Sequence, residues 1–306
     1  MPTVEMGAQC WEGYPCPFMS YCKGKLSAKS VMNLTTLTPS KRKHLLLKKY
    51  KTLDDLPRNI SLTTVQWAEV NALQKAGENY DKGKIKKFVN RITSSRLKCY
   101  IDIEAFMPAV PIYDSCKPYT NLCYQYSIVN SKGNLLKPMD RIIEPGSDPR
   151  RAFIESLLAD TKDAAVIITY NKVPDIAGPP RHDEEKSYFE TRLTELSDLY
   201  PDLQPQIKDR LDKTVDLSEP FAQKYYYHPL LKGSHSLKSI AALMAPDITF
   251  NRLQIANSED ARAGYVELPN LSQDAQFVRK LALKGFLKLS VIAMVRIAEK
   301  LELLAA

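Results

Sequence analysis

The chain has 306 residues, of which 44% are hydrophobic and 25% charged, and its formal net charge is +8. This size allows a substantial core, with one main domain and a smaller one. The most apolar stretch, residues 287–295, is too short to span a bilayer and contains Lys288. The N-terminus lacks the basic start and apolar segment of a secretory signal. We therefore expect a cytoplasmic protein with no membrane partner.

Positive charge is concentrated near the N-terminus. No Asp or Glu lies between Glu12 and Asp54, where the chain carries Lys23, Lys25, Lys29, Lys41, Arg42, Lys43, Lys48, Lys49 and Lys51. Such a stretch attracts nucleic-acid phosphates, although a solvated helix surface is the alternative. As contacts to DNA or RNA we select Lys41, Arg42, Lys43, Lys48 and Lys49.

The N-terminal third is expected to be irregular at first and then helical. We predict a cysteine-rich module at 1–30 and a basic helical module at 31–95. Within the latter, helices are expected at 40–50, 63–76 and 81–91.

Residues 98–106 read as a short apolar strand, Lys-Cys-Tyr-Ile-Asp-Ile-Glu-Ala-Phe. Side chains alternate across a strand, so Asp102 and Glu104 point to the same side. Two acids on a buried strand cost free energy unless a cation pairs with them. A pair of Mg²⁺ or Mn²⁺ ions about 3.5–4 Å apart is one such partner, and it hydrolyses phosphodiesters. The alternative is a pair of solvated acids at a strand end.

The rest of the chain is predicted to form a mixed sheet covered by helices. Strands are expected at 123–129, 136–143, 164–170 and 215–217, with the third of these central. Helices are expected at 148–159, 188–199, 203–213 and 272–304, with Gly285 as a candidate break in the last one. Three successive strands, then a helix and a buried strand, follow the order of the ribonuclease-H-like fold. Several other α/β folds share this order.

Read together, the residues from 98 onward resemble the DnaQ-like (DEDD) 3′–5′ exonucleases. More narrowly, residues 4–304 resemble a bacterial domain-of-unknown-function (DUF) family. In that family a DnaQ-like domain follows a RecB-like, CRISPR-associated-type nuclease with a cysteine cluster. The matching stretches are residues 6–10 through Cys22, 102–104, 118–119, 125–127, 148–150, 168–171, 215–217, 226–229, 233–238 and 293–295. The resemblance implies a DnaQ-like domain at 96–306 and an upstream RecB-like nuclease domain as partner.

The resemblance also implies a two-metal site held by four carboxylates. Asp102 and Glu104 match the first two acids. For the third we favour Glu190, which precedes a helix fitting the family pattern, over Asp175. The family's water-positioning Tyr falls on Phe286 and its fourth acid on Ser290.

These last two positions depart from the family pattern. Phenylalanine cannot hydrogen-bond a water, and a serine hydroxyl is a poor Mg²⁺ ligand beside a carboxylate. We therefore expect a weakened second metal and a rate reduced by orders of magnitude. The sequence predicts a DnaQ-like 3′–5′ exonuclease acting on DNA or RNA. The alternative is a catalytically inactive nucleic-acid-binding or scaffold module.

Cys10, Cys16 and Cys22 are separated by five residues each. Closely spaced cysteines in a cytosolic chain point to a metal or cluster more than to disulfides. In the resembling family they close an iron–sulfur cluster, so a 4Fe-4S cluster here would need a fourth ligand from outside this chain. The alternatives are a knuckle that binds zinc or one that only packs. Cys99, Cys116 and Cys123 show no ligand spacing and are predicted to lie in the core or in loops.

One further basic residue follows a predicted turn. Lys238 lies after Gly233, close to Ser234 and Ser236, and we expect it to contact a phosphate. The preceding run Tyr225-Tyr226-Tyr227 could stack on bases, although packing at a helix end is the alternative.

Overall fold

The computed structural model describes residues 6–10, 14, 16–93, 97–132, 135–170, 187–250 and 253–306. The chain divides into two compact units, the first comprising Met1–Ile85 and Glu219–His235, the second Lys86–Ser218 and Ser236–Ala306. The sequence predicts separate modules at 1–30 and 31–95 and a C-terminal domain that includes 219–235. In the structure, residues 219–235 group with the N-terminal segments, and a strand pair joins 79–80 to 226–227.

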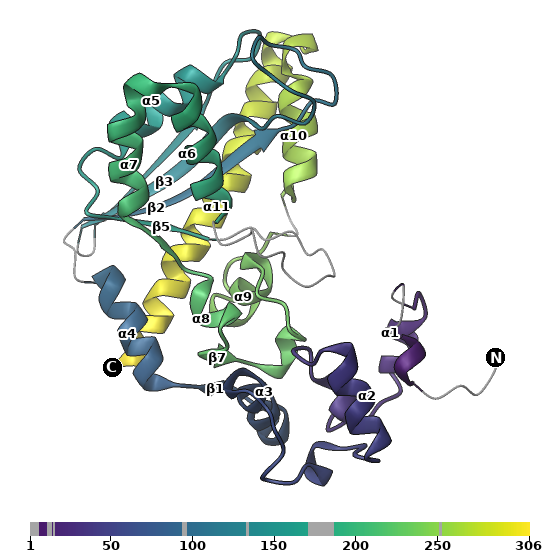
Figure 1. The fold of residues 1–306 in the computed structure, drawn as a ribbon. Coiled ribbons are helices and arrows are strands. Elements are labelled where there is room, and N and C mark those ends of the chain that lie inside the picture. The colour runs from purple at the N-terminus through teal and green to yellow at the C-terminus, as the bar shows by residue number, and fades with distance from the viewer. Residues whose placement is uncertain are drawn as a thin grey trace. The chain divides into compact units, whose positions relative to one another are not determined.

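The first unit is built from short elements (Figure 1). Its 3₁₀ helices, α-helices and strands are η1 (Ala8–Cys10), α1 (Met19–Lys23), η2 (Val31–Asn33), α2 (Pro39–Leu47), η3 (Leu53–Asp55), α3 (Thr64–Lys75), β1 (Asn79–Tyr80), α8 (Glu219–Ala222), β7 (Tyr226–Tyr227) and η5 (Pro229–Leu231). Strands β1 and β7 pair antiparallel. The expected helices at 40–50 and 63–76 are confirmed as α2 and α3, each capped at its start by a threonine side chain.

A buried carboxylate organises this unit. Glu69 on α3 is 0% exposed. Its oxygens accept hydrogen bonds from the backbone N–H and the hydroxyl of both Thr35 and Thr36, at 2.6–3.2 Å. The hydroxyl of Tyr227 donates a further bond at 3.1 Å. Because a buried charge is tolerated when it is fully hydrogen-bonded, Glu69 joins three segments that are distant in the sequence.

The second unit holds the main sheet and the longer helices. Its elements are β2 (Lys98–Phe106), β3 (Leu122–Lys132), β4 (Leu135–Ile142), α5 (Arg150–Asp160), β5 (Val166–Thr169), α6 (Tyr188–Leu199), η4 (Pro201–Leu203), α7 (Gln204–Asp212), β6 (Thr214–Asp216), α9 (Leu237–Met244), α10 (Ser258–Val266), η6 (Leu268–Asn270) and α11 (Gln273–Ala305). Helix α4 (Lys82–Thr93) is continuous across the boundary between the two units.

The sheet has five strands in the order β4-β3-β2-β5-β6. The first three are antiparallel neighbours, whereas β5 and β6 run parallel to β2. The predicted meander is confirmed. The strand expected at 164–170 is β5, which lies in the interior of the sheet between β2 and β6, whereas β2 is the central strand. The mixed α/β class is therefore confirmed, with helices on both faces.

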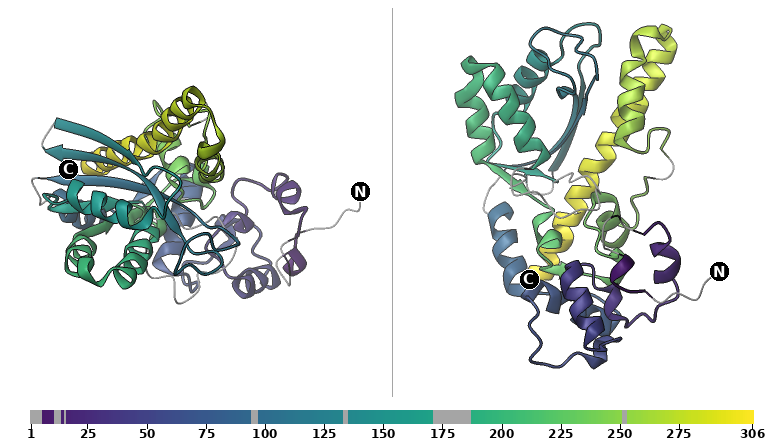
Figure 2. Two further views of the ribbon diagram at one scale, coloured as in Figure 1. Left: turned by 90° about the horizontal axis from the view of Figure 1, so that it is seen from above. Right: turned by 45° about the vertical axis from the view of Figure 1, so that its right-hand side comes forward.

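Alternation along β2 separates the two faces of the sheet. Cys99, Ile101, Ile103 and Ala105 enter a core cluster with residues of α5, α6 and α7. Helix α11 packs against β2, β3 and β4, and α10 also contacts β2. Figures 1 and 2 show α5, α6 and α7 on one side of the sheet and α11 on the other. The even-numbered residues of β2 thus point toward the α10–α11 side.

Helix α11 runs for 33 residues without a break at Gly285. Glycine lowers helix propensity but does not stop a helix, and the flanking residues are good helix formers that pack on the sheet. Gly285 was therefore wrong as a break point. Within the described parts of the chain, no helix is both long enough and apolar enough to cross a membrane.

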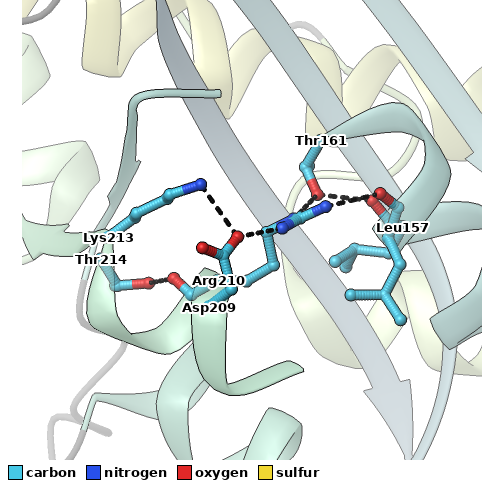
Figure 3. Close-up of polar contacts among 7 residues, drawn as sticks. Leu157, Thr161, Asp209, Arg210, Lys213 and Thr214 are labelled. Atoms are coloured by element: carbon cyan, nitrogen blue, oxygen red, sulfur yellow. Dashed lines mark hydrogen bonds and ion pairs between the residues drawn. The ribbon is translucent and has the colours of Figure 1, made fainter. Parts of the chain in front are cut away.

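The start of β6 is fixed by a polar network (Figure 3). Arg210 on α7 donates to the Thr161 hydroxyl at 3.0 Å, while Lys213 donates to Asp209 at 2.9 Å. The Thr214 hydroxyl donates to the carbonyl of Arg210 at 2.9 Å. These bonds connect α7 to the end of α5 and set where β6 begins.

Candidate functional site

The acid pair lies where strand alternation predicts. Asp102 and Glu104 are 7% and 3% exposed on β2, on the face toward α10 and α11. The Ser258 hydroxyl, at the start of α10, donates to Glu104 Oε1 at 2.8 Å. Asp102 Oδ1 accepts the backbone N–H of Ile103 at 3.0 Å. The structure therefore sets two buried carboxylates on one side of an interior strand.

A β-bulge shapes the surroundings of Glu104. The register between β2 and β3 shifts after Glu104, so that Ala105 pairs with Cys123 and Tyr124 is the extra residue. Tyr124 stacks on Tyr265 of α10 with ring centroids 4.0 Å apart. Burial raises the pKa of Tyr124 far above its usual value, and the charge of Glu104 adds to this. The phenol therefore stays protonated beside the carboxylate.

Glu190 caps the start of a helix in the structure. It is the third residue of α6, and its carboxylate accepts the backbone N–H of Ser187 at 2.7 Å while the Ser187 side chain accepts its N–H. This reciprocal pair is a capping box. The described residues contain no group of three or more His, Cys, Asp or Glu side chains that could hold a metal ion. Asp175, the other candidate, lies outside the described residues.

Phe286 and Ser290 are both buried on α11, each only 3% exposed. The Ser290 hydroxyl donates to the carbonyl of Phe286 in its own helix at 3.4 Å. Nearby, the Gln125 side chain on β3 donates to the Leu283 carbonyl at 2.9 Å. The two positions are buried, and their side chains supply no carboxylate.

Lys238 lies beside this part of α11. Its ammonium is 5.9 Å from the Phe286 ring centroid and 5.7 Å from that of Phe250. It also donates to the carbonyl of Ala256. Lys238 thus lies beside Phe286, where the family resemblance places the water-positioning tyrosine.

Asp216 is an acid that the sequence does not single out. It ends β6, where it pairs in register with Thr169 of β5, and β5 separates it from β2. Its Oδ1 accepts the N–H of Ser218 at 2.8 Å. Its place at the end of a predicted strand was a signal in the sequence, because ligands often bind at the carboxyl ends of parallel strands.

The donors present fit a divalent metal in part. Carboxylate oxygens on one side of a strand suit Mg²⁺ or Mn²⁺. A site for two ions needs more acids than the pair that β2 supplies.

The N-terminal cysteines are not gathered into a ligand set. Cys10 is buried, Cys16 and Cys22 are half-buried, and all three are free thiols. The backbone N–H of Cys16 donates to the carbonyl of Cys10 at 3.2 Å. Because no three thiols converge among the described residues, the donors do not fit an iron–sulfur cluster as they stand. The cluster stays a prediction.

The basic residues near the N-terminus differ in burial and in hydrogen bonding. Arg42 is buried, and its guanidinium donates to the carbonyls of Leu37, Met32 and Leu34. It therefore cannot reach a phosphate, which corrects its selection as a nucleic-acid contact. Lys41 donates to the Ser61 carbonyl at 2.6 Å. Lys43, Lys48 and Lys49 are exposed.

Comparison with known families finds one match. Residues 99–174 and 185–236 match the model of a family described as Domain of unknown function (DUF2779). No curated protein and no solved structure matches the chain.

The matched region holds the acid pair, Glu190 and Asp216. It stops before Lys238, Phe286 and Ser290, and it does not include the N-terminal cysteines. The match supports a relation of this part of the chain to a domain-of-unknown-function family, and that description carries no activity.

Proposed function

We propose that the second unit is a cytoplasmic DnaQ-like 3′–5′ exonuclease domain that cleaves DNA or RNA by metal-dependent phosphodiester hydrolysis at a reduced rate. The observation that carries this proposal is the buried Asp102–Glu104 pair on one face of an interior strand. The strand order supports it, because an antiparallel β4-β3-β2 meander followed by parallel β5 and β6 is the arrangement expected of a ribonuclease-H-like sheet.

The roles of individual residues follow from their contacts. Asp102 and Glu104 would hold a Mg²⁺ or Mn²⁺ ion, which when bound lowers the pKa of a water and neutralises phosphate charge. The hydroxyl of Ser258 fixes one oxygen of Glu104. Tyr124 stacks on Tyr265 and is close enough to Glu104 for the carboxylate charge to raise the pKa of its phenol.

A second candidate is a catalytically inactive nucleic-acid-binding or scaffold module. It is favoured by the contacts of Glu190, the predicted third acid, and of Ser290, which stands where the family resemblance places the fourth acid. Glu190 caps α6, and the Ser290 hydroxyl bonds within α11. A protein that keeps the fold but has lost half its ligands would still bind nucleic acid.

The first test is hydrolysis of end-labelled single-stranded DNA and RNA with Mn²⁺ or with EDTA. We expect slow removal of nucleotides from the 3′ end that needs the metal. Asp102→Asn keeps the size of the side chain and removes its charge, so activity should fall by about 100-fold or more. Ser290→Asp should raise the rate about tenfold or more, because it restores an acid on the sheet side of α11.

The matched control is Asp163→Asn, an exposed acid in the same unit. It should leave the rate unchanged. Activity that survives Asp102→Asn would sink the assignment. An inert wild type that still binds DNA or RNA would establish the second candidate.

A further inference from the structure

Helix α4 has one apolar face and one cationic face. Its apolar residues Ile85, Phe88, Val89 and Ile92 are all buried. The helix contains no Asp or Glu, and its exposed residues include Lys82, Lys84, Lys86, Lys87 and Arg91. Exposed helices usually mix both signs of charge along their surface. The exposed face of α4, defined by these five cations, is therefore of a single sign.

Most of this charge lacks an acid partner. Lys84 lies 3.9 Å from Asp81, in an exposed ion pair that water screens. Across the described ranges of the chain, Lys82, Lys86 and Lys87 form no ion pair. Elsewhere, Lys29, Lys98 and Lys280 each pair with a carboxylate at 2.7–2.9 Å. Three of the five cations on the exposed face of α4 thus have no carboxylate beside them among the residues that the structure describes.

The helix geometry spreads these cations over the exposed side of α4. Because all five lie on one continuous helix, their spacing depends on that helix alone. Lys82 and Lys86 are one turn apart, as are Lys87 and Arg91, which is about 6 Å along the axis. Gly83 occupies the first turn, and a Cβ there would meet only ordinary contact with the Asp81 carboxylate, at 3.4 Å. Packing therefore does not require this glycine, and its missing side chain leaves space beside Lys82 and Lys87.

The partner that fits this face is a polyanion rather than a membrane. A basic amphipathic helix binds a bilayer by burying its apolar face among lipids. In α4 that face is already buried in the protein, so only the electrostatic attraction is left. Lysines meet phosphates as point charges and do not read bases. The contact would therefore be independent of base sequence.

We propose that the exposed face of α4 binds the phosphate backbone of a nucleic-acid strand. This site is separate from the N-terminal basic residues and from the acid pair on β2. The proposal rests on the proposed function for the identity of the partner, whereas the site itself follows from the charge and burial of α4.

The test measures binding of the full chain to fluorescein-labelled single-stranded oligonucleotides. Fluorescence anisotropy reports the binding, in EDTA and at several salt concentrations. The triple variant replaces the three lysines of α4 that lack ion pairs, through Lys82→Gln, Lys86→Gln and Lys87→Gln. We expect binding about tenfold or more weaker at low salt. The slope of log K against log salt should become shallower by about 2, since each lost phosphate contact removes about 0.7.

The control removes the same charge from other exposed lysines, through Lys75→Gln, Lys162→Gln, Lys208→Gln. It should bind within about twofold to threefold of wild type with the same salt slope. Equal weakening in both triple variants, or no weakening in the α4 variant, would overturn the proposal. So would a wild type that binds phosphatidylserine vesicles but no oligonucleotide.

The outcome is separable from that of the proposed exonuclease. Binding through α4 without any metal-dependent degradation supports this inference and removes the exonuclease assignment. If degradation needs Asp102 and the α4 variant binds as well as wild type, the exonuclease assignment is supported and this inference is overturned. Circular dichroism melting of both triple variants checks that each is folded.

Discussion

Cys99 and Cys123 show what burial does to a single side chain. Both are buried on the sheet side that faces α5, α6 and α7. Burial raises the pKa of each thiol to about 12, although a nearby arginine lowers it somewhat in each case. Their assignment to the core from missing ligand spacing is confirmed.

This burial predicts the order of thiol reactivity. Because the thiolate is the reactive form, Cys99 and Cys123 should resist iodoacetamide in the native protein at pH about 8. Cys16, Cys22 and Cys116 are partly accessible and should react. Peptide mass spectrometry after a timed reaction measures this difference. In urea all the cysteines should react alike, and native Cys99 labelled as fast as denatured Cys99 would contradict the burial.

Arg42 shows where reading charge from sequence went wrong. It lies in a run of cations, so its charge suggested a surface role. In the structure three backbone carbonyls surround its guanidinium. Burial lowers its pKa, and the charge of Glu69 opposes that shift. Composition cannot reveal such a role, because it depends on which carbonyls the chain leaves unpaired nearby.

At the scale of elements, the start of α6 accounts for the contact that Glu190 makes. The pattern Ser187-x-x-Glu190 before an apolar-periodic helix is a capping box, and this signal was present in the sequence. The family resemblance favoured a metal ligand at the same residue. The observed contact satisfies the Ser187 N–H, so the helix start accounts for this acid without a metal.

Helix α11 yields a stability prediction. Gly285 lies inside this helix, and a Cβ there would meet nothing within 4 Å. Gly285→Ala should therefore raise the free energy of unfolding by about 0.5–1 kcal/mol. Urea denaturation measures this change. The control is the reverse exchange at a partly exposed position, Ala282→Gly, which should lower stability by a similar amount. A Gly285→Ala variant less stable than wild type would contradict the prediction, because it would mean that the added methyl group clashes with its surroundings.

At the scale of the whole molecule, the two units have separate sources of stability. The first depends on the Glu69 hydrogen bonds and a small apolar cluster, including Val31, Leu45 and Val70. The second depends on the sheet and the helices on its two faces. Local unfolding should therefore differ between the two.

Glu69→Gln tests this separation. An amide group cannot accept the bonds of both Thr35 and Thr36, so one buried N–H loses its partner at a cost of about 1–3 kcal/mol. We expect faster hydrogen exchange in residues 31–75 and 219–235, with β2, β3 and β5 unchanged. Asp54→Asn, at an exposed acid of the same unit, is the control. Equal loss of protection in both units would mean that they unfold together.

The sequence by itself determined the elements and the pairing of the acids. Alternation fixed Asp102 and Glu104 on one side of β2, and apolar periodicity located the strands of the meander and most helices. These features depend on residues close in the chain, so local patterns suffice.

Tertiary structure decided which charged groups are available. Glu69 bonds groups that the fold brings near, Arg42 is buried among backbone carbonyls, and residues 219–235 join the first unit through a strand pair. Burial of the apolar face of α4 likewise left its cations exposed. Such outcomes depend on contacts between distant segments, because desolvation and hydrogen bonding are set by what surrounds a side chain.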